Sequence, residues 1–130
     1  ALNGSLTLER ADIFEYEPSE PFDYALASMV LHHFSADEIA TLIRHVRPFV
    51  RRALIVNDLR RSLVNYLACW FAVRPWSRGV RHDALLSVRR GFTPAELRAI
   101  LRSHDPDATV ETAWFCRVTG VVLFDREARR

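Results

Sequence analysis

Two adjacent histidines, His32 and His33, follow a short apolar run near the start of the sequence. Imidazole titrates near neutral pH, so a histidine placed beside a substrate could remove a proton from it. If the chain is extended at this point, successive side chains point in opposite directions, and at most one of the two rings faces a cleft. The alternative, that both rings only cap the strand and support the next helix, stays open.

Three further polar residues are candidates for a site. Asp58 ends a second apolar run, where it could orient a substrate or cap the helix expected over Arg60–Arg74. His82 lies in an arginine-rich connection that could reach over the same cleft, and we treat it as a second substrate candidate. Asp12 is either a ligand-binding carboxylate or a plain turn residue.

The elements that must position these side chains form a strand–helix–strand unit. Tyr24–Ser28 and Ala53–Val56 are continuous apolar runs with the length of buried strands. Between them, Ser35 and Glu38 have the spacing of a helix capping box, and apolar residues then repeat at helical spacing. A helix joining two buried strands predicts a parallel pair with a right-handed crossover. Ligands bind outside the carboxyl ends of such strands, so Ser28 and Asp58 are expected at one rim.

The second half of the chain adds two helices and a hairpin. A wide apolar face predicts a helix over Arg60–Arg74, and an arginine-rich connection follows over Trp76–Arg90. A second capping box at Thr93 starts another helix. The strands Thr109–Ala113 and Arg117–Phe124 are too close in sequence for a helical crossover, which predicts an antiparallel hairpin.

Composition limits the possible classes of protein. The 130 residues suggest one domain over 1–130, and the net charge of +2 gives no argument for a nucleic-acid partner. No stretch reaches the length of about 18 apolar residues that a membrane span needs, and no histidine, cysteine and carboxylate cluster has metal-ligand spacing. Cys69 and Cys116 lack CxxC spacing, so we expect core packing of both side chains and a cytoplasmic location.

Three segments together resemble the C-terminal part of the class I S-adenosylmethionine-dependent methyltransferases. They are Ala11–Phe14, the Phe22–Phe34 pattern that ends in Leu-His-His-Phe, and Leu54–Leu59. The resemblance covers essentially the whole chain. It implies an α/β fold with a Rossmann-like sheet, parallel strands, a C-terminal antiparallel hairpin and helices on both faces. The segments Arg81–Asp83 and Phe92–Leu97 resemble a bacterial branch that acts on phenolic, quinone-like or polyketide acceptors.

The resemblance also implies roles for individual residues. Asp12 would accept a hydrogen bond from the adenine amino group of S-adenosylmethionine, and Ile13 would pack on the adenine ring. Ala27 and Ser28 would line the methionine end of the cofactor. Met29, His32 and His33 would face the transferred methyl group or begin the following helix, and a small-molecule acceptor would bind beside them.

The sequence departs from the family at its beginning. The family starts with a strand and a GxGxG turn whose glycines let the backbone approach the cofactor, and a second strand ends in an acidic residue. The four glycines of this chain lie far apart. We therefore expect that the N-terminal strands are missing, that the chain is a fragment or a natural truncation, and that activity needs the missing part.

Two other functions are alternatives to methyl transfer. A truncated, non-catalytic remnant could act as an interaction module that associates, for example as a homodimer, through the bare edge of the Tyr24–Ser28 strand. Nucleic-acid binding through Arg74–Arg90 ranks last, because no readout motif accompanies the arginines.

Overall fold

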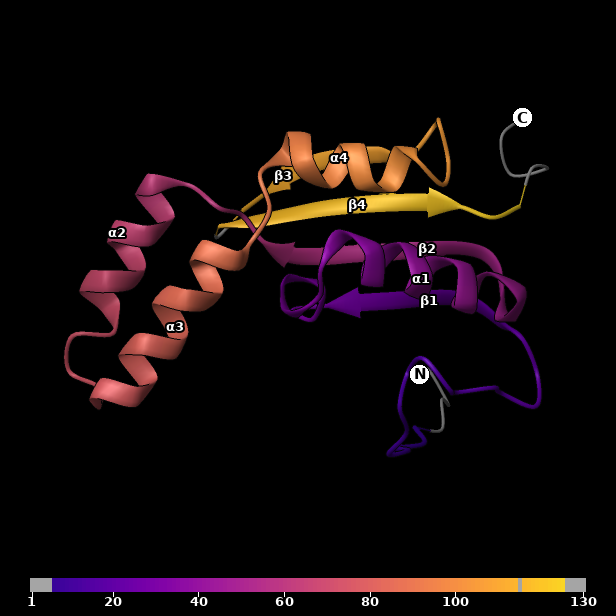
Figure 1. The fold of residues 1–130 in the computed structure, drawn as a ribbon, viewed down its shortest axis with the longest axis horizontal. Helices are drawn as coiled ribbons and strands as arrows, with labels where there is room; N and C mark the ends of the chain where they lie inside the picture. The colour runs from indigo at the N-terminus through magenta and orange to yellow at the C-terminus, as the bar shows by residue number, and fades with distance from the viewer. Residues whose placement is uncertain (1–5, 115, 126–130) are drawn as a thin grey trace, which may run out of the picture.

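A computed structural model describes residues 6–114 and 116–125 of the chain, and a four-stranded mixed sheet lies at its centre (Figure 1). The strands are β1 (Phe22–Ser28), β2 (Val50–Leu59), β3 (Thr109–Ala113) and β4 (Arg117–Leu123). Their order across the sheet is β1-β2-β4-β3. β4, the last strand in the chain, therefore lies between β2 and β3.

β1 and β2 are parallel, and their register aligns Ala27 with Val56 and Ser28 with Asn57. β4 runs antiparallel to both β2 and β3. The parallel pair and the C-terminal hairpin predicted from the sequence are thus confirmed. Because β1 and β2 end side by side, the residues that follow them share one rim of the sheet.

In the described part of the chain, four α-helices and two short 3₁₀ turns connect the strands. The α-helices are α1 (Ala36–Val46), α2 (Leu63–Ala72), α3 (Arg78–Arg90) and α4 (Pro94–Arg102), and the 3₁₀ turns are η1 (Leu31–His33) and η2 (Arg47–Phe49). α1 and α4 begin with the predicted capping boxes, in which Ser35 pairs with Glu38 and Thr93 with Glu96. Each box satisfies backbone N–H groups that the first turn of a helix leaves unpaired.

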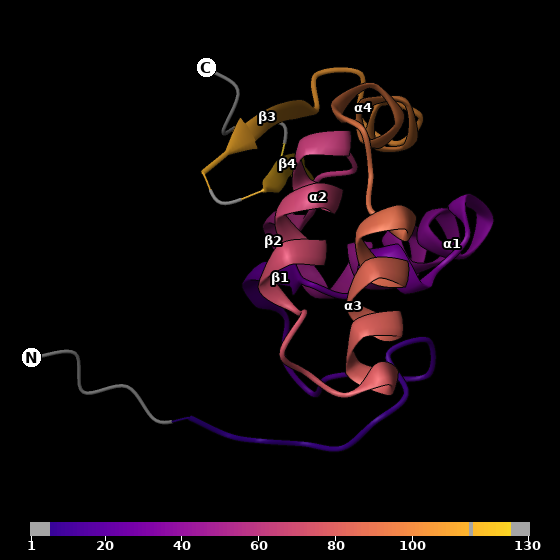
Figure 2. The same cartoon turned by 90° about the vertical axis from the view of Figure 1, so that its left-hand side faces the viewer.

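The hydrophobic core lies between one face of the sheet and the helices α1 and α4 (Figures 1 and 2). Its fully buried side chains come from α1, α4, β2, β4 and the η1 turn; they include Leu31, Ile39, Ile43, Val56, Leu97, Leu101, Val118 and Val122. This core fixes η1 against the sheet, and η1 carries the paired histidines.

The prediction of helices on both faces holds for one face only in the described part of the chain. α2 and α3 pack on each other beyond the carboxyl ends of β1 and β2, rather than on the second face (Figures 1 and 2). On that second face Tyr24 and Leu26 are 53% and 67% exposed. Within the described residues β1 pairs with β2 alone, so the sheet is open at β1.

One expected helix start and one expected connection differ from the structure. α2 begins after Ser62, not at Arg60, because the backbone of Arg60 and Arg61 continues β2 and donates to the carbonyls of Cys116 and Phe92. Most of the connection predicted over Trp76–Arg90 is the helix α3, which Ser77 caps.

Candidate functional site

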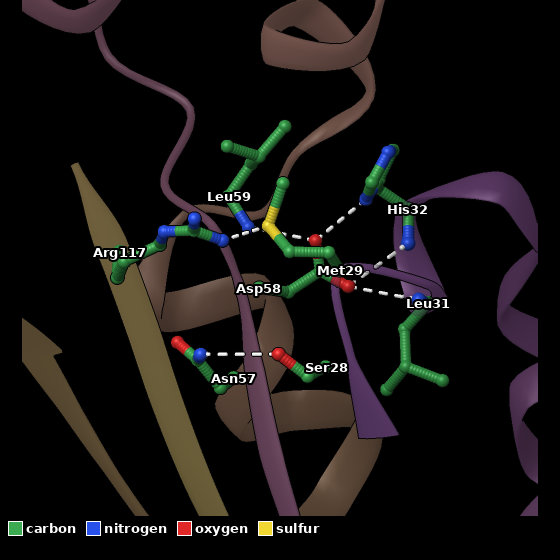
Figure 3. Close-up of polar contacts among 8 residues, drawn as sticks. All are labelled: Ser28, Met29, Leu31, His32, Asn57, Asp58, Leu59 and Arg117. Atoms are coloured by element: carbon green, nitrogen blue, oxygen red, sulfur yellow. Dashed lines mark hydrogen bonds and ion pairs between the residues drawn. The ribbon is translucent and has the colours of Figure 1, made fainter. Parts of the chain in front are cut away.

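The carboxyl ends of β1 and β2 meet at a rim that carries most of the predicted site residues (Figure 3). Met29 follows β1 with a φ of 57° and donates its amide to the carbonyl of Asn57 at 2.9 Å. A left-handed backbone is unfavourable for a residue with a side chain, and such positions cluster at functional sites. The conformation turns the chain sharply from β1 into η1.

Asp58 joins the ends of the two strands from inside the protein. Its carboxylate is fully buried. Oδ2 accepts from the amides of Leu31 and His32 at 2.8 and 3.2 Å, and Oδ1 lies 2.7 Å from the amide of Leu59 and 2.6 Å from Nδ1 of His32. The end of β2 therefore holds the turn that follows β1 through backbone and side-chain bonds together.

The alternative that Asp58 caps the following helix is wrong, because Ser62 caps α2 by accepting from the amide of Asn65. The burial of Asp58 also separates its carboxylate from any ligand outside the rim. In the β1–α1 connection, the Asp58 carboxylate bonds to the backbone amides of Leu31 and His32 and to the His32 ring. The spacing of these residues in the sequence does not reveal this pairing.

The two histidines differ in their surroundings. They lie in the 3₁₀ turn η1 rather than in extended chain, so the expectation of opposite-facing rings does not apply. The side chain of His32 is only 3% exposed, whereas His33 is exposed. The ring centroids are 4.1 Å apart, with 38° between the ring planes. His33 is thus the histidine that solvent or a ligand can reach.

Asn57 and Arg117 join the rim without having been predicted as site residues. Asn57 donates from its side-chain amide to the Ser28 hydroxyl at 3.3 Å, and Arg117 contacts the sulfur of Met29 across β2 (Figure 3). Asn57 follows an apolar run directly and could have been found from that position. Arg117 reaches the rim only because β4 pairs with β2, so its place depends on the sheet order.

The residues implied as cofactor-binding gather beside the open edge of β1. Ile13 and Ala27 line an apolar cavity of about 200 Å³, to which α1, β2 and the chain after β1 also contribute. Ser28 and Met29 follow Ala27 at the rim. The carboxylate of Asp12 is exposed, and its Oδ1 accepts from the amide of Phe14 at 2.9 Å, which forms a turn.

The structure places three other expected residues differently. His82 lies on α3 with its side chain exposed, and not in a loop over the cleft. Cys116 is exposed and has a φ of 65°, so its expected core packing is wrong. Cys69 is partly buried, and burial, followed by the nearby Cys116, raises the pKa of the Cys69 thiol.

The described residues offer neither a metal cluster nor a membrane-spanning helix. Within residues 6–114 and 116–125, no group of three or more His, Cys, Asp and Glu side chains is arranged to hold a metal ion. None of the helices in these ranges has the length and apolar character needed to cross a bilayer.

Comparison with known proteins finds similarity in structure but not in sequence. No protein-family model matches the sequence, and no curated protein is significantly similar to it. The plantazolicin methyltransferase BpumL, solved with a desmethylPZN analogue and SAH, superposes on 89% of this chain with a TM-score of 0.69 and 11% identity. A structure from Nostoc punctiforme assigned as an O-methyltransferase gives a TM-score of 0.60 over 87% of the chain with 16% identity.

A third similar structure, the mitomycin 7-O-methyltransferase MmcR, gives a TM-score of 0.52 over 87% of this chain with 22% identity. The chain spans 58% of the BpumL chain, 34% of the Nostoc chain and 32% of the MmcR chain. These likenesses in structure extend over 87–89% of this chain. The chain therefore has the Rossmann-like fold of the class I S-adenosylmethionine-dependent methyltransferases.

Proposed function

We propose that this chain is the C-terminal portion of an S-adenosylmethionine-dependent methyltransferase, and that its β1–β2 rim holds the methionine end of the cofactor. The observation that carries the proposal is the left-handed turn at Met29, which lies at the carboxyl ends of two parallel strands and beside an apolar cavity. Ligands of open α/β sheets bind at this rim. The similarity in fold to methyltransferases solved with SAH supports the same reading.

The residues beside β1 fit the chemistry of S-adenosylmethionine. Ile13 and Ala27 offer apolar surface to the faces of an adenine ring, and the exposed Asp12 carboxylate can accept from the adenine amino group while its Oδ1 holds the turn. Ser28 and Met29 lie at the rim for the methionine end. When bound, the cofactor supplies an electrophilic methyl group on a sulfonium sulfur.

The protein's part in the transfer is to bring the acceptor in line with that methyl group and to take its proton. We assign the proton-accepting role to His33, which is exposed on the turn directly after the rim. The acceptor is proposed to be a small organic molecule, methylated on oxygen or carbon. The family resemblance points to a phenolic, quinone-like or polyketide compound.

The proposal concerns the whole enzyme, because the chain spans 58% of BpumL. In the intact domain, a further strand would pair with the open edge of β1. A glycine-rich turn after that strand would close the other side of the cofactor. The protein to test is therefore the product of the complete reading frame that encodes these residues.

The decisive experiment is titration calorimetry of that protein with S-adenosylhomocysteine, followed by an assay of methyl transfer from labelled S-adenosylmethionine to a panel of phenols and quinols. We expect saturable binding of one cofactor per chain and transfer to at least one acceptor. Failure to bind S-adenosylhomocysteine would refute the proposal. Cofactor binding without transfer to any member of the panel would refute the acceptor class alone.

A further inference from the structure

We infer that Asp58 and His32 form a buried positioning pair, which sets the place of the rim and of His33, while His33 accepts the proton. This inference rests on the proposed methyl transfer, and it divides the two histidines into different roles. Sequence alone treats them as equivalent, because they are identical neighbours.

Burial is the first observation that separates the two roles. A general base must come within about 2.6–3.2 Å of the atom that carries the proton it removes, or reach that atom through one water. The side chain of His32 is 3% exposed in a chain that leaves much of its apolar surface open, so its cover comes from the chain's own residues. Further segments of the intact domain could only bury the His32 side chain more deeply. His33 is exposed on the same turn.

The bonding of Asp58 is the second observation. The carboxylate receives two amides of the η1 turn, the amide of Leu59 and the His32 ring, so both oxygens are used by the protein (Figure 3). An acceptor oxygen 2.6 Å from Nδ1 places the ring proton on Nδ1. The ring is thus locked in position and in tautomer by a strand 26 residues away.

The contact between the two rings also fixes the position of the His33 ring. With ring centroids 4.1 Å apart, His32 forms one wall against which the His33 ring packs. The same turn starts at Met29, whose amide is held by Asn57, the residue before Asp58. Loss of the Asp58–His32 bond would therefore loosen the rim and His33 together. An error of about 1 Å in such an arrangement lowers a rate roughly 100-fold.

Two substitutions of His32 separate positioning from proton transfer. His32→Asn keeps a nitrogen donor near the place of Nδ1 but has no ring nitrogen in the place of Nε2, whereas His32→Gln lacks the donor near Nδ1. If His32 positions the rim, His32→Asn keeps kcat within about tenfold of the wild type and His32→Gln loses about 100-fold. If His32 were the base, both variants would lose kcat equally, by about 10²–10⁴-fold, which would overturn the inference.

His33→Gln provides the complementary test. We expect kcat to fall about 10²–10⁴-fold. The KM for S-adenosylmethionine and the hydrogen exchange of the Leu31 and His32 amides should stay as in the wild type. A His33→Gln enzyme with wild-type kcat would overturn the assignment of the base.

Asp58→Asn supplies a spectroscopic readout that does not depend on activity. Asparagine keeps an oxygen for the turn amides but presents its NH2 group to His32 and loses the bond from the Leu59 amide. The His32 ring should then move its proton to Nε2, as 15N spectra of the ring would show. With His32 as a base, that change of tautomer would cost kcat about 10⁴-fold. With His32 as a positioning residue, the loss should stay near tenfold.

The amide measurements also separate failure of this inference from failure of the proposed function. Protection of the Leu31 and His32 amides that is retained in His32→Asn and lost in His32→Gln would support positioning even if the wild type bound no S-adenosylhomocysteine. Equal protection in both variants would overturn it even in an active methyltransferase.

Discussion

Oδ1 of Asp58 lies 2.6 Å from Nδ1 of His32, although the two are 26 positions apart in the sequence, Asp58 in β2 and His32 in the η1 turn after β1. The bond crosses from β2 to the turn after β1 and is buried on both sides. It fixes the relative position of two segments that lie at the rim where parallel sheets bind ligands.

Asp58→Ala should strongly destabilise the fold. The change leaves the amides of Leu31 and His32 buried without their acceptor and removes the partner of the His32 ring. Breaking a buried pair in this way costs about 3–5 kcal/mol, which urea denaturation would measure. The control is Asp12→Ala, at an exposed carboxylate. A loss below about 1 kcal/mol would contradict the role given to Asp58.

Gly91→Ala should also be destabilising, because a Cβ at Gly91 would lie 2.6 Å from the carbonyl oxygen of Leu59. That oxygen accepts from the amide of Phe92, and neither backbone segment can move freely. We expect a loss of about 1–3 kcal/mol in the free energy of unfolding. Gly79→Ala is the matched control, since a Cβ there meets nothing within 4 Å, and its helical position predicts a gain of up to about 1 kcal/mol. Equal effects of the two changes would show that the junction at Leu59 is not close-packed.

The two capping boxes should make stability depend on pH in the acidic range. The Ser35 amide and then the Ser35 hydroxyl lower the pKa of Glu38, and the Thr93 amide is the main cause that lowers the pKa of Glu96. A carboxyl whose folded-state pKa is depressed stabilises the fold above its unfolded pKa of about 4.3, and the effect is lost as pH falls through the folded value.

Urea denaturation of the wild type and of a Glu38→Gln, Glu96→Gln double variant would test this. The wild type should be more stable at pH 7, and the difference should shrink towards pH 3. Thr41→Ala, at an exposed position within α1, controls for a change on the helix surface. A difference that is independent of pH would mean that the ionised carboxylates do not form the caps.

His104 should make the protein less stable as pH falls below neutrality. Burial, followed by the charges of Arg44 and Arg47, lowers the pKa of His104, and its Nε2 is buried with no hydrogen-bond partner among the described residues. Below an unfolded pKa of about 6.5 the unfolded chain takes up the proton first, so the free energy of unfolding falls. His104→Gln should flatten this loss between pH 7 and pH 5, with exposed His82→Gln as the control for removing a histidine. An unchanged slope in His104→Gln would contradict the prediction.

Ile13→Ser should weaken binding of S-adenosylhomocysteine by the complete protein. Ile13 is 41% exposed beside the apolar cavity, where an adenine ring would cover it. Covering most of such a side chain contributes about 1.5 kcal/mol, or roughly a tenfold change in Kd by calorimetry. Leu8→Ser, at a side chain 87% exposed in the same segment, is the control. Equal affinities for wild type and Ile13→Ser would place the adenine ring elsewhere.

The sequence by itself determined the local elements of this protein. The boxes at Ser35 and Thr93 identified the starts of α1 and α4, because the hydrogen bonds of a cap involve residues only three positions apart. Apolar runs identified β1 and β2, and the short spacing of the last two strands required a hairpin. The sequence did not reveal α3. This segment is rich in arginine, and its few apolar residues form no clear helical stripe.

Only the tertiary structure decided which polar residues meet. The parallel pairing of β1 with β2 placed Asp58 under the η1 turn, and the order β1-β2-β4-β3 brought Arg117 to Met29. These contacts join residues far apart in sequence, so no rule based on residue spacing predicts them. The same packing buried His32 and left His33 exposed, a difference between identical neighbours that depends on what surrounds each ring and not on its place in the chain.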